Sequence, residues 1–219
     1  MRHLTCGVIF MLFAAARTAA QTREPLPWFV VDLHAASVGL PTAEGWIPLV
    51  PADTPVPDRA WGPAVATTVY PFRLGIMTFG FGAAFSMAEG KSDSLEIIEG
   101  SGATATTRIT PVVRTRVTSL IPQVSINFGH KFGWSYLSAG VGRTKVDSRA
   151  DYVDGRVSVP AVWSQALNFG GGARWFMKPR LGAGFDVRFV KLGSRDATAT
   201  LPAARRTQMI TFSAGLTLQ

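Results

Sequence analysis

The chain has 219 residues, enough for one domain with a hydrophobic core, and 22 basic against 14 acidic residues give it a formal net charge of +8. The basic residues form no continuous run, which argues against a nucleic-acid-binding protein and fits contact with anionic lipid better. The single cysteine, Cys6, excludes a fold held by several disulfide bonds.

The N-terminal segment has the pattern of an export signal. Arg2 and His3 precede an apolar run at residues 6–16, and small residues that could form a cleavage site follow it. The run is shorter than the roughly 20 apolar residues that a membrane-spanning helix needs. We therefore expect residues 1–20 to be a cleaved signal peptide and residues 21–219 to form one exported domain.

Eight later segments alternate between apolar and small or polar residues with a period of two, which is typical of strands that have one apolar face. In the third segment, for example, Phe79, Phe81 and Phe85 alternate with glycine and other small residues. The eighth segment would leave an unpaired edge unless the sheet closes into a barrel. In chain order, the segments are residues 28–38, 61–70, 76–87, 118–128, 134–146, 163–176, 181–192 and 208–219.

The connections between these segments also alternate, in length. Short ones follow the second, fourth and sixth segments, and long ones follow the first, third, fifth and seventh. Short turns at one end and long loops at the other are typical of outer-membrane β-barrels, whose termini lie on the periplasmic side. Asp154-Gly155 signals a tight turn in the third long loop, so we expect a hairpin that continues past the membrane there, and another over residues 103–118.

A soluble barrel of the lipocalin type is the main alternative fold. Its outer face would carry lysine and glutamate on the parity that meets water. Here the less apolar parity is mostly Gly, Ser, Thr, Ala and Asn, and the second, third and eighth segments contain no charged residue. The pattern therefore favours a membrane barrel with apolar side chains outward and small, hydrophilic side chains in a narrow lumen.

Over residues 28–219 this layout resembles the OmpA/OmpX-type eight-stranded outer-membrane barrels. The resemblance is one of pattern, and the chain departs from it by ending on Leu218-Gln219 where such barrels usually end on an aromatic residue. It implies an all-β fold: an eight-stranded antiparallel up-and-down transmembrane β-barrel after an N-terminal signal peptide. It also implies insertion into the bacterial outer membrane by the barrel-assembly machinery.

Five charged or titratable side chains have inward parity in the half of the barrel nearest the short turns. Buried charges persist only when they are paired, so we expect a structural network of ion pairs that fills the lumen. The alternative is a proton- or anion-responsive gate in which the histidine titrates. The five residues are Asp32, His34, Arg174, Asp186 and Arg188.

Four cations with outward parity, Arg114, Arg116, Arg143 and Lys145, flank the apolar runs of the fourth and fifth segments. A tilted strand advances roughly 2.4 Å per residue along the membrane normal. Arg116 and Lys145 are therefore about 29 Å above the short turn, beyond an apolar band of about 25 Å. We expect one patch at the outer rim that binds lipopolysaccharide phosphates, with solvated rim charge as the alternative.

Aromatic residues near the segment ends fit the girdles that flank the apolar band of a membrane barrel. The alternative is a packing role in a soluble core. The residues expected at the interfaces are Phe128, Trp134, Trp163 and Trp175.

The first long loop is rich in proline and contains Trp46. Prolines stiffen such a loop and prevent regular pairing. We expect it to pack at the solvent-exposed surface, and the alternatives are a lid over the barrel mouth or a binding surface.

The sequence contains no triad motif, metal-ligand spacing or phosphate-binding glycine loop, so we expect no enzyme, no metal and no cofactor. The expected function is a structural or surface-interaction role through long extracellular loops. The alternatives are a narrow channel or conduit for small or hydrophobic solutes and a lipid-modifying barrel enzyme. The expected state is a monomer whose partners are outer-membrane lipid or lipopolysaccharide, the barrel-assembly machinery and a surface partner at the loops.

Overall fold

The computed structural model describes residues 26–41, 43, 45–48, 50–51, 53–99, 106–197, 199 and 202–219. The predicted signal segment 1–20 lies outside the described residues. The described part of the chain has no helix that is long and apolar enough to cross a membrane.

The described residues form ten strands. They are β1 (Phe29–Gly39), β2 (Arg59–Leu74), β3 (Met77–Lys91), β4 (Glu96–Glu99), β5 (Thr106–Ile109), β6 (Val112–His130), β7 (Gly133–Tyr152), β8 (Gly155–Lys178), β9 (Leu181–Leu192) and β10 (Thr207–Leu218).

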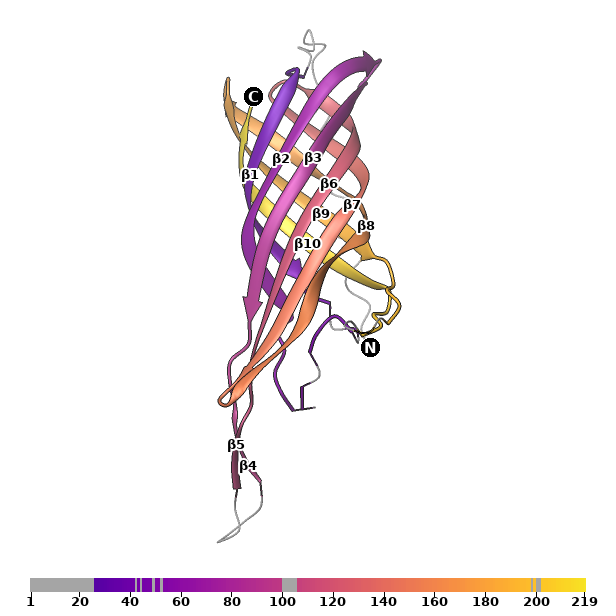
Figure 1. Cartoon of the computed structure of the whole chain (residues 1–219). Coiled ribbons are helices and arrows are strands. Elements are labelled where there is room, and N and C mark those ends of the chain that lie inside the picture. The colour runs from indigo at the N-terminus through magenta and orange to yellow at the C-terminus, as the bar shows by residue number, and fades with distance from the viewer. Residues whose placement is uncertain are drawn as a thin grey trace, which may run out of the picture.

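Eight of these strands close into an antiparallel barrel in the order β1-β10-β9-β8-β7-β6-β3-β2 (Figure 1), while β4 and β5 pair only with each other. The last strand closes the barrel by pairing with the first, from Val31 opposite Leu218 to Val38 opposite Thr211. Every barrel strand thus neighbours the barrel strands before and after it, which is the up-and-down topology. All eight predicted segments are confirmed as barrel strands, and most extend further than the sequence pattern indicates.

The turns at the short end each contain two residues: Gly75-Ile76, Lys131-Phe132 and Pro179-Arg180. Gly75 has a φ of 60°, a left-handed conformation that favours glycine. The predicted tight turn of the third long loop lies one residue earlier than expected, at Val153-Asp154, because Gly155 opens β8 and pairs with Tyr152.

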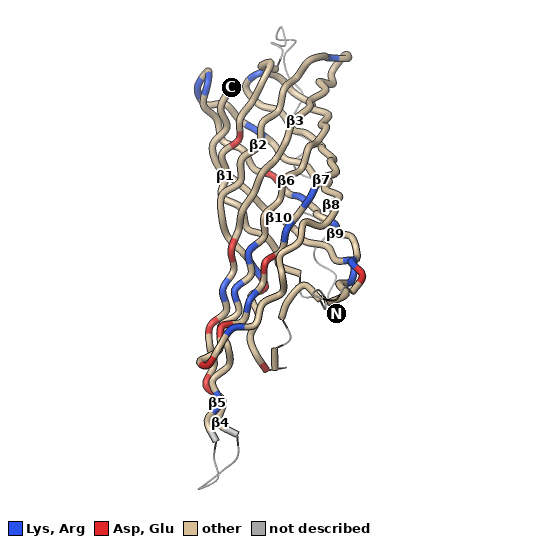
Figure 2. The backbone as a smooth tube through the Cα atoms, viewed as in Figure 1, with Lys and Arg blue, Asp and Glu red and all other residues tan. Residues whose placement is uncertain are grey.

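The outer surface of the barrel is apolar. Figure 2 shows few charged residues on the barrel wall, and they gather instead at its ends and along the hairpins that project from it. A continuous apolar belt of this kind on a closed barrel indicates contact with lipid. The prediction that the apolar parity points outward is therefore confirmed. Exposed members of the belt include Leu33, Phe81, Phe85, Leu120, Val124, Leu137, Val141, Leu167, Phe185, Phe212 and Leu216.

The lumen has two layers, which corrects the prediction of a uniformly small and hydrophilic interior. The half nearest the short turns holds the charged residues together with a smaller buried cluster of Leu26, Val30, Tyr70, Trp134, Tyr136 and Phe176. The half nearest the long loops is filled by a buried apolar cluster in which inward residues of the barrel strands pack with loop residues, because loops cover the mouth and exclude water there. The cluster comprises Val38, Leu40, Trp46, Ala60, Ala88, Val117, Ile121, Val146, Ala166, Val190, Leu192, Ala204 and Met209.

Two hairpins extend from the barrel at the long-loop end (Figure 1). One is formed by β7 and β8, which contain 20 and 24 residues, whereas a tilted strand crosses a bilayer with roughly 9–11. The other is formed by β3 and β6 and carries the β4–β5 hairpin beyond them. The extended hairpin predicted around Asp154 is confirmed. The second one, predicted over residues 103–118, has different bounds: residues 106–118 supply β5 and the first part of β6, whose partners are β4 and β3, and residues 103–105 lie outside the described residues. We call the two hairpins together the outer arm.

Candidate functional site

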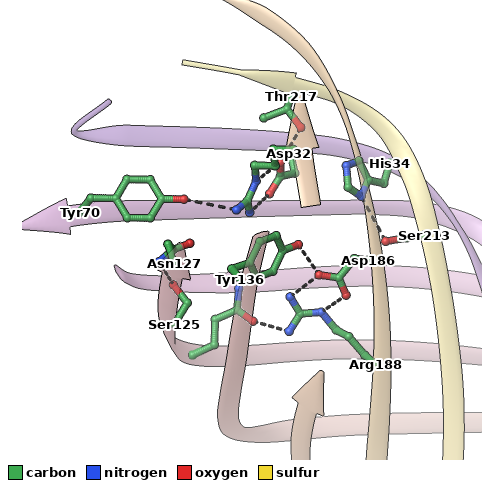
Figure 3. Close-up of polar contacts among 12 residues, drawn as sticks. Asp32, His34, Tyr70, Ser125, Asn127, Tyr136, Asp186, Arg188, Ser213 and Thr217 are labelled. Carbon is green, nitrogen blue, oxygen red and sulfur yellow. Dashed lines mark hydrogen bonds and ion pairs between the residues drawn. The ribbon is translucent and has the colours of Figure 1, made fainter. Parts of the chain in front are cut away.

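The polar half of the lumen is built around one buried ion pair between strands far apart in the sequence. Arg174 of β8 binds Asp32 of β1 through two hydrogen bonds, with Nη2 at 2.6 Å and Nε at 3.0 Å from the two carboxylate oxygens. Thr217 of β10 donates a third hydrogen bond to the same carboxylate at 2.8 Å (Figure 3). Burial strengthens these contacts, because water cannot replace them.

Aromatic side chains surround the Arg174 guanidinium. It lies 4.1 Å from the ring centre of Tyr136 and 5.9 Å from that of Trp134, and it donates a hydrogen bond to the Tyr70 hydroxyl at 3.3 Å. Trp134 also stacks on Phe176 at 5.1 Å between ring centres. These rings close the lumen at the short-turn end.

The prediction that Trp134 lies at the membrane interface is wrong. Its side chain is 3% exposed and points into the lumen. The physical reason is parity: Trp134 lies two residues before the inward Tyr136, so the pleat sends both side chains to the same face.

A second ion pair lies deeper in the barrel. Arg188 binds Asp186 on the same strand, with Nε 2.6 Å from the carboxylate. The Tyr136 hydroxyl donates to that carboxylate, and Arg188 also donates to the side chain of Gln123 (Figure 3). Charge on both groups is thereby compensated inside the barrel.

His34 lies beside this network. Its Nδ1 is 3.1 Å from the Ser213 hydroxyl, and its Nε2 has no hydrogen-bond partner. The structure therefore brings all five predicted lumen residues into one region. Sequence reasoning missed Tyr70, Gln123, Tyr136, Ser213 and Thr217, although each has inward parity.

A cavity of about 60 Å³ separates the polar network from the apolar cluster. Its lining includes His34, Ser213 and Arg188 of the polar region and Ile121 and Met209 of the apolar cluster. Its volume is enough for a few water molecules.

The mouth above this cavity is closed by Trp46 of the first long loop, which is 2% exposed. The indole Nε1 donates to the carbonyl of Arg205 at 2.8 Å, and the Arg195 guanidinium lies 5.4 Å from the ring centre. Gly45 has a φ of 84°, and a Cβ there would lie 1.9 Å from the carbonyl oxygen of Ala203. The first and last long loops thus interlock over the mouth.

The loop is therefore a lid, and the prediction of solvent-exposed packing is wrong for Trp46. A stretch of proline and tryptophan does not reveal which ring faces the lumen. Trp61, the other tryptophan next to this loop, is 65% exposed on the outer face of β2.

The predicted cationic patch is divided by acidic residues that the sequence reasoning left out. Arg116 binds Glu89 of the adjacent strand at 2.6 Å. Arg114 lies 3.9 Å from Glu89 and 3.6 Å from Asp151. Arg143 and Lys145 lie closer to the barrel and form no ion pair with a described residue.

The ion pair between Glu89 and Arg116 makes a pH-dependent contribution to the base of the arm. Hydrogen bonds from Arg116, together with the charges of Arg116 and Arg114, hold the pKa of the Glu89 carboxyl below its ordinary value of 4.5. A lowered pKa stabilises the folded state fully above the unfolded value, and this stabilisation is lost as pH falls through the folded value.

We therefore expect hydrogen exchange of the amides around Glu89 to accelerate when the pH falls from 6 to below 4.5, after correction for intrinsic exchange. The variant Glu89→Gln should lack this acceleration. Equal acceleration in the variant would show that another group is responsible.

The remaining predicted interfacial aromatics have exposed side chains on the outer surface. Phe128 lies two residues before the end of β6 at the short-turn side, and Trp175 stacks on Phe185 at 5.5 Å near the same end. Trp163 lies at the opposite end, where Lys145 approaches its ring to 5.7 Å.

The described residues contain no group of three or more His, Cys, Asp or Glu side chains that could hold a metal ion. Within the described lumen, aromatic rings pack at the short-turn end, two ion pairs lie in the middle and Trp46 covers the opposite end. What the arrangement can do is seal the barrel and hold its strands in register.

No protein-family model and no curated protein sequence matches the chain. Solved structures match it by fold. Neisserial surface protein A (NspA) has a TM-score of 0.50 and 12% sequence identity, covering 89% of this chain and 99% of that chain. OprG from Pseudomonas aeruginosa has a TM-score of 0.47 and 12% identity, with 90% and 97% covered. Ail of Yersinia pestis has a TM-score of 0.42 and 10% identity, with 87% and 95% covered.

At these identities the similarity concerns the fold alone, and of these three structures NspA has the TM-score that supports it. The resemblance to OmpA/OmpX-type barrels is confirmed at that level, because the strand number, the antiparallel closure and the outward apolar belt all agree with it. By its fold, the chain is an eight-stranded up-and-down β-barrel of the outer-membrane type.

Proposed function

We propose that the protein is a sealed barrel of the bacterial outer membrane that presents the outer arm as an interaction surface outside the cell. The observation that carries the proposal is the length of the β7–β8 hairpin, which continues far beyond the apolar belt. Strands that long are not needed to cross the membrane. The apolar belt and the predicted export signal support the location.

The arm has features of a binding surface. Ion pairs along it, such as Arg156 to Asp151 at 2.6 Å, hold neighbouring strands together. Apolar side chains are nevertheless exposed at its tip, among them Val153 and Ile98. An open cleft of about 900 Å³ lies between β5 and the β7–β8 turn. Exposed apolar groups beside a cleft, on a segment surrounded by water, are typical of protein contact sites.

The proposal can be tested by replacing Val153 with a photo-crosslinking amino acid and irradiating intact cells. We expect a discrete cross-linked protein product that is lost when Val157, which lines the same cleft, is changed to Asp. The same cross-linker at Leu137, on the lipid-facing wall, is the control and should not give that product. The absence of a product at Val153, or its persistence in Val157→Asp, would contradict the proposal.

A conduit for small hydrophobic solutes is the second candidate, and the apolar outer half of the lumen favours it. Transport would require Trp46 to leave the mouth and the Arg174–Asp32 pair to separate. Breaking a buried ion pair costs several kcal/mol, so we propose the sealed state as the resting one.

Conductance across planar lipid bilayers distinguishes the two candidates. We expect the purified barrel to give no steady ion-permeable openings at neutral pH. Regular single-channel steps would instead support the conduit. Heat-modifiable gel migration of the same sample confirms that a silent protein is folded.

We propose no catalytic role. The one close pair of a hydroxyl and a histidine discussed above, Ser213 and His34, lies in the lumen beneath the lid, away from lipid and from the cell surface. Lipid A mass spectra from cells with and without the protein should therefore be identical, and a new or missing acyl group would revive the enzymatic alternative.

A further inference from the structure

We propose that the outer face of β7, β8 and β9 carries a binding site for the phosphate groups of lipid A. The site consists of Arg143, Lys145, Lys191 and Arg206, which we call the boundary cations. It differs from the predicted rim patch, because it leaves out Arg114 and Arg116 and adds two residues from β9 and the last long loop.

The strand register brings three of the boundary cations together, and Arg206 joins Lys191 in lining a cleft on this face. On β7, Arg143 lies opposite Gln165 and Lys145 lies opposite Trp163, both of β8. On the other side of β8, Lys191 of β9 lies opposite Leu167. Neighbouring strands are about 4.8 Å apart, so β7 and β9 are separated by only about 10 Å here.

These cations lie where the wall leaves the membrane. The outward side chain changes from Val141 to Arg143 along β7, and from Phe189 to Lys191 along β9. Arg143 is ten residues beyond Gly133 at the short turn, so a tilted strand places it about 24 Å up, close to the edge of an apolar band of about 25 Å. Lipid phosphates of the outer leaflet occupy this level. Figure 2 shows basic residues on β7 at the corresponding part of the wall.

A cleft of about 350 Å³ on this face has the polarity that an anionic lipid requires. Val141 and Leu167 provide apolar lining, while Lys191 and Arg206 provide positive charge. An acyl chain can pack against the apolar part while the phosphate contacts the cations.

The boundary cations are available to an anion, unlike the cations of the arm. None of them forms an ion pair with a described acidic residue. Lys145 lies 5.7 Å from the ring centre of Trp163, and Lys191 lies 5.4 Å from that of Phe169. A cation–π contact does not neutralise the charge, so the ammonium groups can still bind phosphate oxygens.

The test measures how much lipid A the purified full-length barrel retains after detergent exchange, by native mass spectrometry. The probes are bis-phosphorylated lipid A, dephosphorylated lipid A and phosphatidylglycerol. The site variant is Arg143→Gln, Lys145→Gln, Lys191→Gln and Arg206→Gln combined. The control variant removes the same number of charges from the base and tip of the arm, as Arg114→Gln, Arg116→Gln, Arg149→Gln and Arg156→Gln.

We expect the wild type and the control variant to retain bis-phosphorylated lipid A, and the site variant to retain at least tenfold less. Dephosphorylated lipid A should bind the wild type as weakly as the phosphorylated form binds the site variant. Equal retention by the site variant, equal loss in the control variant, or equal binding of phosphatidylglycerol would each overturn the proposal. Heat-modifiable gel migration shows whether both variants are folded, so that a decrease in lipid A retention cannot result from unfolding.

Discussion

Replacing Arg174 with methionine is expected to destabilise the folded barrel by about 3–5 kcal/mol. The substitution keeps much of the side-chain length but leaves the Asp32 carboxylate buried without its partner, and it removes the cation from between Tyr136 and Trp134. Urea unfolding of the barrel in lipid vesicles, followed by heat-modifiable gel migration, measures the change.

Two further variants make this result specific. Arg156 also binds an aspartate, Asp151, at 2.6 Å, but at the exposed arm, so Arg156→Met should cost less than about 1 kcal/mol. The double variant Asp32→Leu with Arg174→Met should recover most of the loss, because it removes both buried charges. If Arg174→Met unfolds at the same urea concentration as the wild type, the Asp32–Arg174 ion pair does not stabilise the folded barrel.

Replacing Trp46 with alanine is expected to weaken the docking of the lid by about 3 kcal/mol, the lower end of the range for a buried tryptophan. Each 1.4 kcal/mol corresponds to a factor of ten, so the amides under the lid should exchange with solvent more than about a hundredfold faster. Arg195 and Ala204 are suitable reporters, because their backbones bond each other in both directions at 2.9 and 2.8 Å.

Trp61→Ala is the matched control for this experiment, since that ring is on the outer face of β2. It should leave exchange at Arg195 and Ala204 unchanged. Gly45→Ala should act in the same direction as Trp46→Ala, because a Cβ at Gly45 meets the Ala203 carbonyl at 1.9 Å and forces the loops apart. Wild-type protection in both lid variants would mean that Trp46 does not close the mouth.

The period-two pattern was sufficient to predict the barrel. Residues such as Phe79, Phe81 and Phe85 identify one face of a strand, and the alternation of short and long connections orders the strands. The same parity correctly directed Asp32 and Arg174 into the lumen. It did not show that these two bind each other, because the partner across a barrel depends on register and shear as well as on parity.

Two physical features of the site are not visible in a local sequence pattern. Trp134 lies near a strand end, as an interfacial aromatic would, but it shares the parity of Tyr136 and therefore faces inward. Trp46 and the acidic partners of the rim cations depend on contacts between distant segments. Glu89 lies opposite Arg116 only because β3 and β6 pair in that register, and a single sequence does not encode such a contact as a local pattern.

One parity of each barrel strand faces lipid, while the other parity is sealed from it. Nitroxide scanning of β10 tests it directly, with single-cysteine substitutions at residues 210–214 and 216 in lipid vesicles. Labels at Ile210, Phe212, Ala214 and Leu216 should show high collision rates with lipid-soluble oxygen, and labels at Thr211 and Ser213 should be shielded from both oxygen and a water-soluble nickel reagent. High nickel accessibility at the Phe212 and Leu216 positions, or no alternation at all, would contradict the account.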